Sequence, residues 1–290
     1  MYPAKFEYYR AKDVHEALQL MAKHSGAKLL AGGHSLLPMM KLRLTQPTAL
    51  IDIGRIVGLT GVYREKNHIH IGSLTTHTEL ANSELLREIC PLLSAAASLI
   101  ADPQVRNKGT IGGNLAHADP GSDLPAVILA LDGIVHTTGP NGDRQIKSTD
   151  FFLDLLTTDL HPNELITKIT VPIPSRETGC SYLKFEHPAS GYSICGAAAI
   201  VKLTSDGTCQ NATLCFNGIS ATPHRAEAVT KVLIGTKLED TTIDNAFDGH
   251  LNIPEPIGDI YASSKYRVEM AKVYGRRALS SAKQQVDLKH

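Results

Sequence analysis

The stretch LLAGGHSLLPMMKLRL, residues 29–44, places an apolar run, two glycines, a histidine and a serine ahead of a second apolar segment. The apolar run predicts a short buried strand, and Pro38 suits the first turn of a helix. Gly32 and Gly33 therefore fall in the connection between strand and helix. There they allow either a tight turn or the close approach of a ligand to bare backbone N–H groups. This pair alone favours a tight turn.

A second glycine pair, Gly112 and Gly113, lies in the segment TIGGN, residues 110–114, within a stretch that we interpret as a polar loop over residues 102–114. Consecutive N–H groups in such turns form an anion-binding concavity. Small hydrogen-bonding residues follow each glycine pair, so the two loops could hold a diphosphate from two sides with few cationic side chains. With two such pairs in one chain, a diphosphate-binding role and two ordinary tight turns explain the sequence equally well.

Charge and motif content exclude several function classes. The 29 basic and 29 acidic residues cancel, so no strong field attracts the chain to nucleic acid or to an anionic membrane. The sequence contains no G-x-G-x-x-G, no G-x-x-x-x-G-K-[ST], no H-E-x-x-H and no G-x-S-x-G motif. A Rossmann dinucleotide site, a P-loop, a zincin and an α/β-hydrolase are therefore not indicated.

The five cysteines are scattered and form no C-x-x-C pair, which argues against an iron–sulfur cluster, a zinc ribbon or a disulfide framework on this chain. His68 and His70 share a face of a predicted strand without a carboxylate or cysteine at ligand spacing, so we expect no metal site there. The start of the chain lacks the apolar core of a signal peptide. No run reaches the roughly 18 apolar residues of a membrane span. We expect a cytoplasmic protein without an integral membrane segment.

The order of the predicted elements indicates an α+β protein with a boundary near Pro172–Gly179. Before the boundary we expect an α/β unit over residues 1–55 and a larger α/β unit over 56–175. Their predicted elements are a helix (13–24), a strand (48–54), hairpins (59–72 and 133–148), helices (76–101 and after Ser122) and a closing strand (163–174). Over residues 176–290 we expect three long strands followed by helices, the β-β-β-α-α pattern.

Two further groups of residues are candidates for ligand contacts. His117, Asp119 and Asp123 follow the second glycine pair, where they could hydrogen-bond ligand hydroxyls or serve as loop and helix-cap residues. Tyr192 lies in a turn rich in glycine and serine, which suits either a packed surface aromatic or a cover for a planar ring.

The segments AGGHSLLPMMKLRL and IADPQVRNKGTIGGNLAHADPGSDLPAVILALDG resemble the FAD-binding medium subunits of the molybdenum hydroxylases, the family of carbon monoxide dehydrogenase and xanthine dehydrogenase. IGSLTTHTEL (71–80) and NGISATPHRAEAV (217–229) fit the same family, so the resemblance covers nearly the whole chain. It implies a vanillyl-alcohol-oxidase-type (PCMH) FAD-binding domain over residues 1–175, made of two α/β subdomains. It also implies a carbon monoxide dehydrogenase flavoprotein C-terminal domain over residues 176–290.

The resemblance also implies the residues that contact FAD. One loop would place its backbone N–H groups on the diphosphate, and it comprises Gly32, Gly33, His34, Ser35 and Leu36. The opposing loop comprises Thr110, Ile111, Gly112, Gly113 and Asn114. Asp123 matches an aspartate that hydrogen-bonds FAD, Leu165 or Ile166 would lie near the cofactor, and Tyr192 matches an aromatic residue that shields the isoalloxazine. No residue of this chain is implied as catalytic.

The implied function is that of an electron-transfer flavoprotein subunit. A large partner subunit would carry the molybdenum cofactor and the substrate site, and a small partner would carry two 2Fe-2S clusters. The three chains would form a dimer of heterotrimers, and electrons would pass from the clusters to FAD and on to an external acceptor. A free-standing flavin oxidase or dehydrogenase and a non-enzymatic assembly module are the alternatives. Carbon monoxide, aldehydes, purines and other N-heterocycles stay open as substrates, because the substrate site lies on another chain.

One segment departs from the family pattern. Many members have an arginine and an aspartate where this chain has His187 and Gly191, in the sequence HPASGY that ends at Tyr192. These two differences affect the segment that would cover the far face of the flavin. They are also the kind of difference that can mark a subfamily.

Overall fold

The N-terminal unit is a small parallel sheet in the computed structural model, which describes residues 2–287. Its strands are β1 (Glu7–Arg10), β2 (Lys28–Leu30) and β3 (Ala49–Asp52), in the order β1-β3-β2. Two helices complete the unit, α1 (Val14–Lys23) and α2 (Leu36–Lys41). Asp13 caps α1, since its side chain accepts a hydrogen bond from the Glu16 backbone N–H at 2.8 Å. The α/β character predicted for this part of the chain is confirmed.

The central unit is built on an antiparallel sheet in the order β4-β5-β10-β6-β7. Both predicted hairpins form: β4 (Val62–Glu65) with β5 (His68–Gly72), and β6 (Ile134–Gly139) with β7 (Gly142–Lys147). The predicted closing strand, β10 (Leu165–Pro172), lies between the two hairpins and pairs with β5 and β6. Its position in the middle of the sheet explains why it is largely buried and apolar.

Seven helices surround this sheet in the described part of the chain, and several are short. They are α3 (His77–Asn82), α4 (Glu84–Ile89), α5 (Pro91–Ser98), α6 (Pro103–Arg106), α7 (Ile111–His117), α8 (Asp123–Ala130) and α9 (Ser148–Phe151). A small hairpin of β8 (Phe152–Asp154) and β9 (Thr157–Thr158) follows α9.

The interpretation of residues 102–114 as a polar loop is wrong. Asp102 caps α6 by accepting from the Val105 N–H at 2.9 Å, and Pro103 occupies the first helical position. Thr110 caps α7 in the same way, with the Gly113 N–H as donor at 3.2 Å. Two cap residues therefore start helices where glycine and polar content indicated a loop. Gly112 and Gly113 lie in the first turn of α7.

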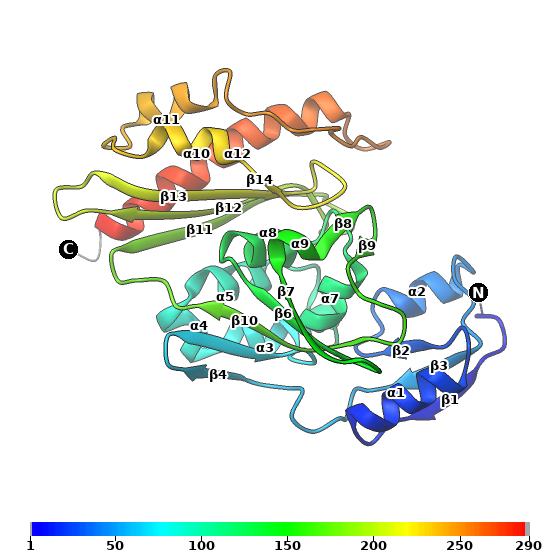
Figure 1. The fold of residues 1–290 in the computed structure, drawn as a ribbon. Coiled ribbons are helices and arrows are strands. Elements are labelled where there is room, and N and C mark those ends of the chain that lie inside the picture. The colour runs from blue at the N-terminus through cyan, green and yellow to red at the C-terminus, as the bar shows by residue number, and fades with distance from the viewer. Residues whose placement is uncertain (1, 288–290) are drawn as a thin grey trace.

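The C-terminal unit is an antiparallel sheet covered by helices on its outer face (Figure 1). The three predicted long strands are β11 (Thr178–Glu186), β12 (Ser193–Leu203) and β13 (Cys209–Asn217), and β14 (His224–Arg225) adds a short fourth. The helices are α10 (Glu227–Leu233), α11 (Asp240–Phe247) and α12 (Ser264–Asp287). Their apolar side chains form one core with Ala197, Ala199 and Val201 of β12.

Helix α8 joins the central and C-terminal units. All eight of its residues are buried, and it packs against β12 and β13. Ala198 of β12 faces the central core, whereas its neighbours Ala197 and Ala199 face the helices, as the two-residue period of a strand requires. At the end of α8, Arg225 of β14 donates a 2.5 Å hydrogen bond to Asp132. The two units therefore share a continuous packed boundary.

Two negative findings concern the described residues. Over residues 2–287 no helix has the length and apolar content needed to span a bilayer. The same residues contain no cluster of three or more histidine, cysteine or acidic side chains that could hold a metal ion, and all five cysteines are buried.

Candidate functional site

A cavity of about 860 Å³ opens where the three units meet. This volume lies toward the upper end of the range of about 300–1,000 Å³ for small-molecule and cofactor sites. The walls include 12 of the 13 residues expected at the site: Gly32, Gly33, His34, Ser35, Leu36, Thr110, Gly112, Gly113, Asn114, Asp123, Ile166 and Tyr192. Ile111 is the exception, because its side chain is fully buried in the central core.

The first glycine loop offers a row of free backbone donors. Gly33 has a φ of +76°, a conformation that favours glycine and turns the chain from β2 into α2. Across residues 2–287, no protein acceptor receives a hydrogen bond from the backbone N–H groups of residues 32–36. Ser35 is the N-cap residue of α2, but its side chain caps no N–H of that helix. Five consecutive amide groups on the cavity wall are thus left to bind a ligand or water.

The second loop differs, because four of its five backbone amides already have protein acceptors. The Ile111 N–H donates to Thr75 O at 3.0 Å and the Gly112 N–H to Ser73 O at 2.8 Å. The Gly113 and Asn114 N–H groups donate to the side-chain and backbone oxygens of the cap residue at 3.2 and 2.9 Å. The expectation that both loops present free N–H groups is therefore wrong for this loop, whose amides start a helix. Of the two loops, only the first has a row of backbone N–H groups without protein acceptors among residues 2–287.

The glycines of the two loops serve different purposes. A Cβ on Gly32 would lie 1.9 Å from the Lys108 carbonyl oxygen, so this glycine lets the two loops touch each other. A Cβ on Gly112 would lie 2.6 Å from Cβ of Ser73, so this glycine lets α7 pack on the end of β5. A Cβ on Gly113 would meet only its own cap residue at 3.0 Å and Ala31 at 4.0 Å. Gly113 thus borders open cavity space opposite the first loop.

Three wall residues carry buried polar atoms without a protein partner: Ser73 Oγ, His77 Nδ1 and Asn114 Oδ1. The amide nitrogen of Asn114 donates to Ser122 Oγ at 3.2 Å, which fixes the side chain. His77 was not expected at the site, since nothing in its sequence context distinguishes it from a surface histidine. Burial lowers the pKa of His77 to about 4, with smaller contributions from Arg106 and His34, so the ring is neutral near pH 7.

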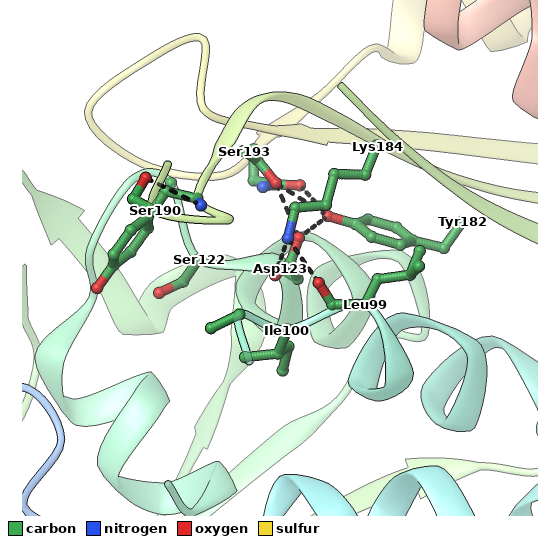
Figure 2. A network of polar contacts seen from close by, with 12 residues as sticks. Leu99, Ile100, Ser122, Asp123, Tyr182, Lys184, Ser190 and Ser193 are labelled. Carbon is green, nitrogen blue, oxygen red and sulfur yellow. Dashed lines mark hydrogen bonds and ion pairs between the residues drawn. The ribbon is translucent and has the colours of Figure 1, made fainter. Parts of the chain in front are cut away.

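Asp123 is the centre of a buried network rather than a helix cap (Figure 2). Its Oδ1 accepts from the Tyr182 hydroxyl at 2.5 Å and from Ser193 Oγ at 2.8 Å, and its Oδ2 accepts from Lys184 Nζ at 3.0 Å. Lys184 also donates to the Leu99 carbonyl at 2.9 Å. Burial raises the pKa of Asp123, and Lys184 and the two hydroxyl donors oppose that shift. The network thus ties the start of α8 to β11 and β12.

The mouth of the cavity is bordered by Tyr192, which is 44% exposed. Burial, Asp119 and Asp123 raise the pKa of Tyr192 to about 12, so its hydroxyl stays protonated. The preceding residue, Gly191, has a φ of +68°, and a Cβ there would lie 3.0 Å from Cα of Ala101. Glycine at this position therefore lets the loop lie directly on the turn that follows α5.

A further part of the wall comes from the segment of residues 158–166, which includes both Leu165 and Ile166. Glu164 anchors this segment, although its side chain is nearly inaccessible to solvent. It accepts from Thr137 Oγ1 at 2.5 Å, from Arg144 at 2.9 Å and from the His161 N–H at 2.8 Å. The anchored carboxylate fixes a stretch that would otherwise be free to move. Neither Glu164 nor Arg144 had been expected to shape the site, because their pairing spans 20 residues of sequence.

Two known protein families together match most of this chain. A family described as "FAD binding domain in molybdopterin dehydrogenase" matches residues 4–174, and one described as "CO dehydrogenase flavoprotein C-terminal domain" matches residues 181–282. The carbon monoxide dehydrogenase medium chain of Hydrogenophaga pseudoflava is 40% identical over 97% of this chain and 98% of its own length. The glyceraldehyde dehydrogenase medium chain of Sulfolobus acidocaldarius is 36% identical over 96% and 98%. Among solved structures, a chain of quinoline 2-oxidoreductase from Pseudomonas putida 86 is 27% identical, with a TM-score of 0.94 over 99% of both chains.

Proposed function

Because this chain belongs to the FAD-binding medium-subunit family of the molybdenum hydroxylases, we propose that the cavity binds one FAD and that the chain relays electrons within a larger complex. The observation that carries the proposal is the row of five backbone amides at residues 32–36, which have no protein acceptor in the described part of the chain and belong to residues that line a cavity of about 860 Å³. A diphosphate is the part of FAD that such a row would bind.

The residues present fit this cofactor. Free N–H groups supply donors for an anion, and Gly113 leaves open space opposite them, which a side chain would fill. Asn114 Oδ1 is an unpartnered acceptor in the wall. In other parts of the lining, Ile166 and Tyr192 offer apolar and aromatic surface of the kind that packs against a flat ring system. Asp123 lines the cavity, but its carboxylate already accepts three hydrogen bonds, so we assign it the role of holding the wall in place.

FAD supplies the redox chemistry, since a flavin can take up electrons one at a time and release them singly or in pairs. The chain binds the diphosphate through residues 32–36 and orients the cofactor between the two loops. Its buried network at Asp123 keeps the C-terminal strands closed against the cavity, which limits water access. No side chain is required to move a proton to or from a substrate, and we assign none as catalytic.

The proposed partners are a large molybdenum-cofactor subunit and a small 2Fe-2S subunit. The names of the relatives, which describe them as medium chains, support this proposal. We further propose a dimer of heterotrimers located in the cytoplasm, where the thiols of the five buried cysteines would stay reduced. We propose two domains, residues 1–175 and 176–290, which the two family matches support. The similar relatives differ in their named substrates, as expected if the substrate site lies on another subunit.

The test is to purify the full chain, add FAD, remove the excess and record the absorbance spectrum. We expect one tightly held flavin per chain and no turnover of carbon monoxide, aldehydes, purines or other N-heterocycles by the chain alone. Turnover by the chain alone would favour a free-standing flavin oxidase or dehydrogenase. A sample that stays colourless with FAD would favour an assembly module. The chain should then be co-expressed with the large and small subunits. In that complex, addition of the substrate should reduce the bound flavin.

A further inference from the structure

We propose that His187 is a positioning residue for Tyr192: its unprotonated Nδ1 holds the loop of residues 187–192 closed over the mouth of the cavity. This inference rests on the proposed function, because Tyr192 matters only if a flavin lies beneath it. The segment is the one in which this chain departs from the arginine and aspartate of many family members, so the device is expected to be a feature of this chain and of chains that share the histidine.

The loop is organised around one nitrogen atom. His187 Nδ1 lies 3.3 Å from the Ala189 N–H, 3.3 Å from the Ser190 N–H and 3.2 Å from Ser190 Oγ. Two of these three neighbours are backbone amides, which can only donate. Nδ1 must therefore present its lone pair, and the ring proton resides on Nε2.

Hydrogen bonds connect the backbone of Tyr192 to Ser190 and His187. Its N–H donates to Ser190 Oγ at 3.3 Å, and its carbonyl accepts from the His187 N–H at 2.8 Å. The Gly191 N–H donates to the His187 carbonyl at 2.9 Å. The backbone of Tyr192 is thus fixed by a short chain of hydrogen bonds that ends at the imidazole. Figure 2 places Ser190 on the loop beside the Asp123 network.

The loop lies on a rigid platform, the turn of residues 99–101. Lys184 binds the Leu99 carbonyl at 2.9 Å, and Arg106 binds the carbonyls of Ile100 and Ala101 at 2.8 and 2.7 Å. Gly191 approaches this turn closely enough that a side chain there would meet Ala101. Because the platform is fixed by two cations, the position of Tyr192 depends on whether the loop itself keeps its shape.

A proton on Nδ1 would convert the acceptor into a donor that faces two other donors. The loop would then lose both backbone contacts to the ring, and Ser190 Oγ would change from donor to acceptor of the Nδ1 proton. With only that contact left, the loop would no longer be held closed over the cavity and would release Tyr192. The titratable group in ring contact with His187 is Tyr261, at 4.3 Å between ring centres. Glu186 precedes His187 in the chain, and Asp259, near Tyr261, is paired with Arg267 at 2.6 Å. Among residues 2–287 no carboxylate forms an ion pair with His187, so no anion there would hold a protonated ring in place.

The experiment uses the full chain loaded with FAD and measures flavin fluorescence at a series of pH values from about 8 down to about 5. A tyrosine held against the flavin quenches its fluorescence. We expect a quenched flavin at the upper end and, at the lower end, a reversible loss of that quenching to the level of the Tyr192→Ala variant. Free FAD, measured in the same buffers, is the reference.

Three variants test the assignment. His187→Asn places an acceptor oxygen where Nδ1 lies and cannot be protonated, so it should stay quenched at both ends of the range. His187→Ala should be unquenched throughout, and Tyr192→Ala should be unquenched and independent of pH. A His187→Asn chain that titrates like the wild type, or a wild type that shows no change, would overturn the proposal. A wild-type chain that binds no FAD at about pH 8 would instead overturn the proposed function. The Asn variant and the wild-type titration remain decisive if the Ala variant does not fold.

Discussion

Lys184 Nζ lies 3.0 Å from Asp123 Oδ2, and both side chains are almost completely buried, with 2% and 5% of their surface exposed. This ion pair joins β11 of the C-terminal unit to the helix that borders the cavity. Charges removed from water this thoroughly are stable only while each satisfies the other and the remaining hydrogen bonds are made. The pair therefore makes the C-terminal unit a part of the cavity wall.

Removing the cation should be costly for stability. In Lys184→Met, Asp123 keeps its two hydroxyl donors but loses the opposite charge, and the free energy of unfolding should fall by about 3–5 kcal/mol. The matched control is Lys237→Met, which breaks an exposed pair with Asp206 and should cost at most about 1 kcal/mol. Urea denaturation of the three proteins at neutral pH measures both differences. Equal losses in the two variants would contradict the structural role assigned to Lys184.

The open space at Gly113 leads to a second prediction. Gly113→Val should abolish retention of FAD, since the added side chain would occupy the gap between α7 and Ala31 without meeting backbone atoms. The control is Ala95→Val, which adds the same branched side chain at an exposed position of α5 that does not line the cavity. Flavin absorbance after gel filtration gives the readout. A normal flavin spectrum in Gly113→Val would contradict the assignment of this glycine to the cofactor site.

Much of this architecture was predictable from local patterns. Alternating apolar residues predicted the hairpins at residues 59–72 and 133–148, and the three long strands after Pro174 were equally clear. The helices of residues 102–114 were missed because glycine and polar content outweighed two cap residues, Asp102 and Thr110. Periodicity also could not reveal that β10 runs between the two hairpins, since strand order depends on long-range packing.

At the site, too, local sequence patterns predicted some features, whereas features that depend on long-range contacts were missed. The candidate residues near the glycine pairs, except Ile111, line one cavity, because each pair lies in a stretch whose turn chemistry is local. The use of the backbone amides was not predictable: in the second loop, those of Ile111 and Gly112 donate to Thr75 and Ser73, which lie far away in sequence. Lys184, His77 and Glu164 were missed for the same reason, since what distinguishes each is burial beside partners from other segments.

The neutral state of His77 predicts a pH dependence of stability. The pKa of His77 is about 4 in the folded chain and about 6.5 when unfolded, so the unfolded chain binds more protons between these values. Stability is therefore complete above about pH 6.5 and falls as the pH decreases, by about 3 kcal/mol once the pH is below about 4. His77→Gln cannot take up this proton. The difference in unfolding free energy between wild type and variant should shrink or change sign between about pH 7 and about pH 4, and a constant difference would contradict the prediction.

Tyr192 should govern the reactivity of the flavin more than its retention. The proposed diphosphate contacts lie at residues 32–36, and Tyr192 borders the mouth of the same cavity, so Tyr192→Ala leaves those contacts intact. Loss of one aromatic contact of about 0.5–1.5 kcal/mol corresponds to a rise of at most about tenfold in the dissociation constant of FAD. Exposure of the flavin ring should instead change the rate of its reoxidation after chemical reduction, which stopped-flow absorbance follows. Tyr63→Ala, an exposed tyrosine that stacks on His70 of the central sheet, is the control and should match the wild type in both measurements. Wild-type reoxidation kinetics in Tyr192→Ala would show that this tyrosine does not cover the flavin.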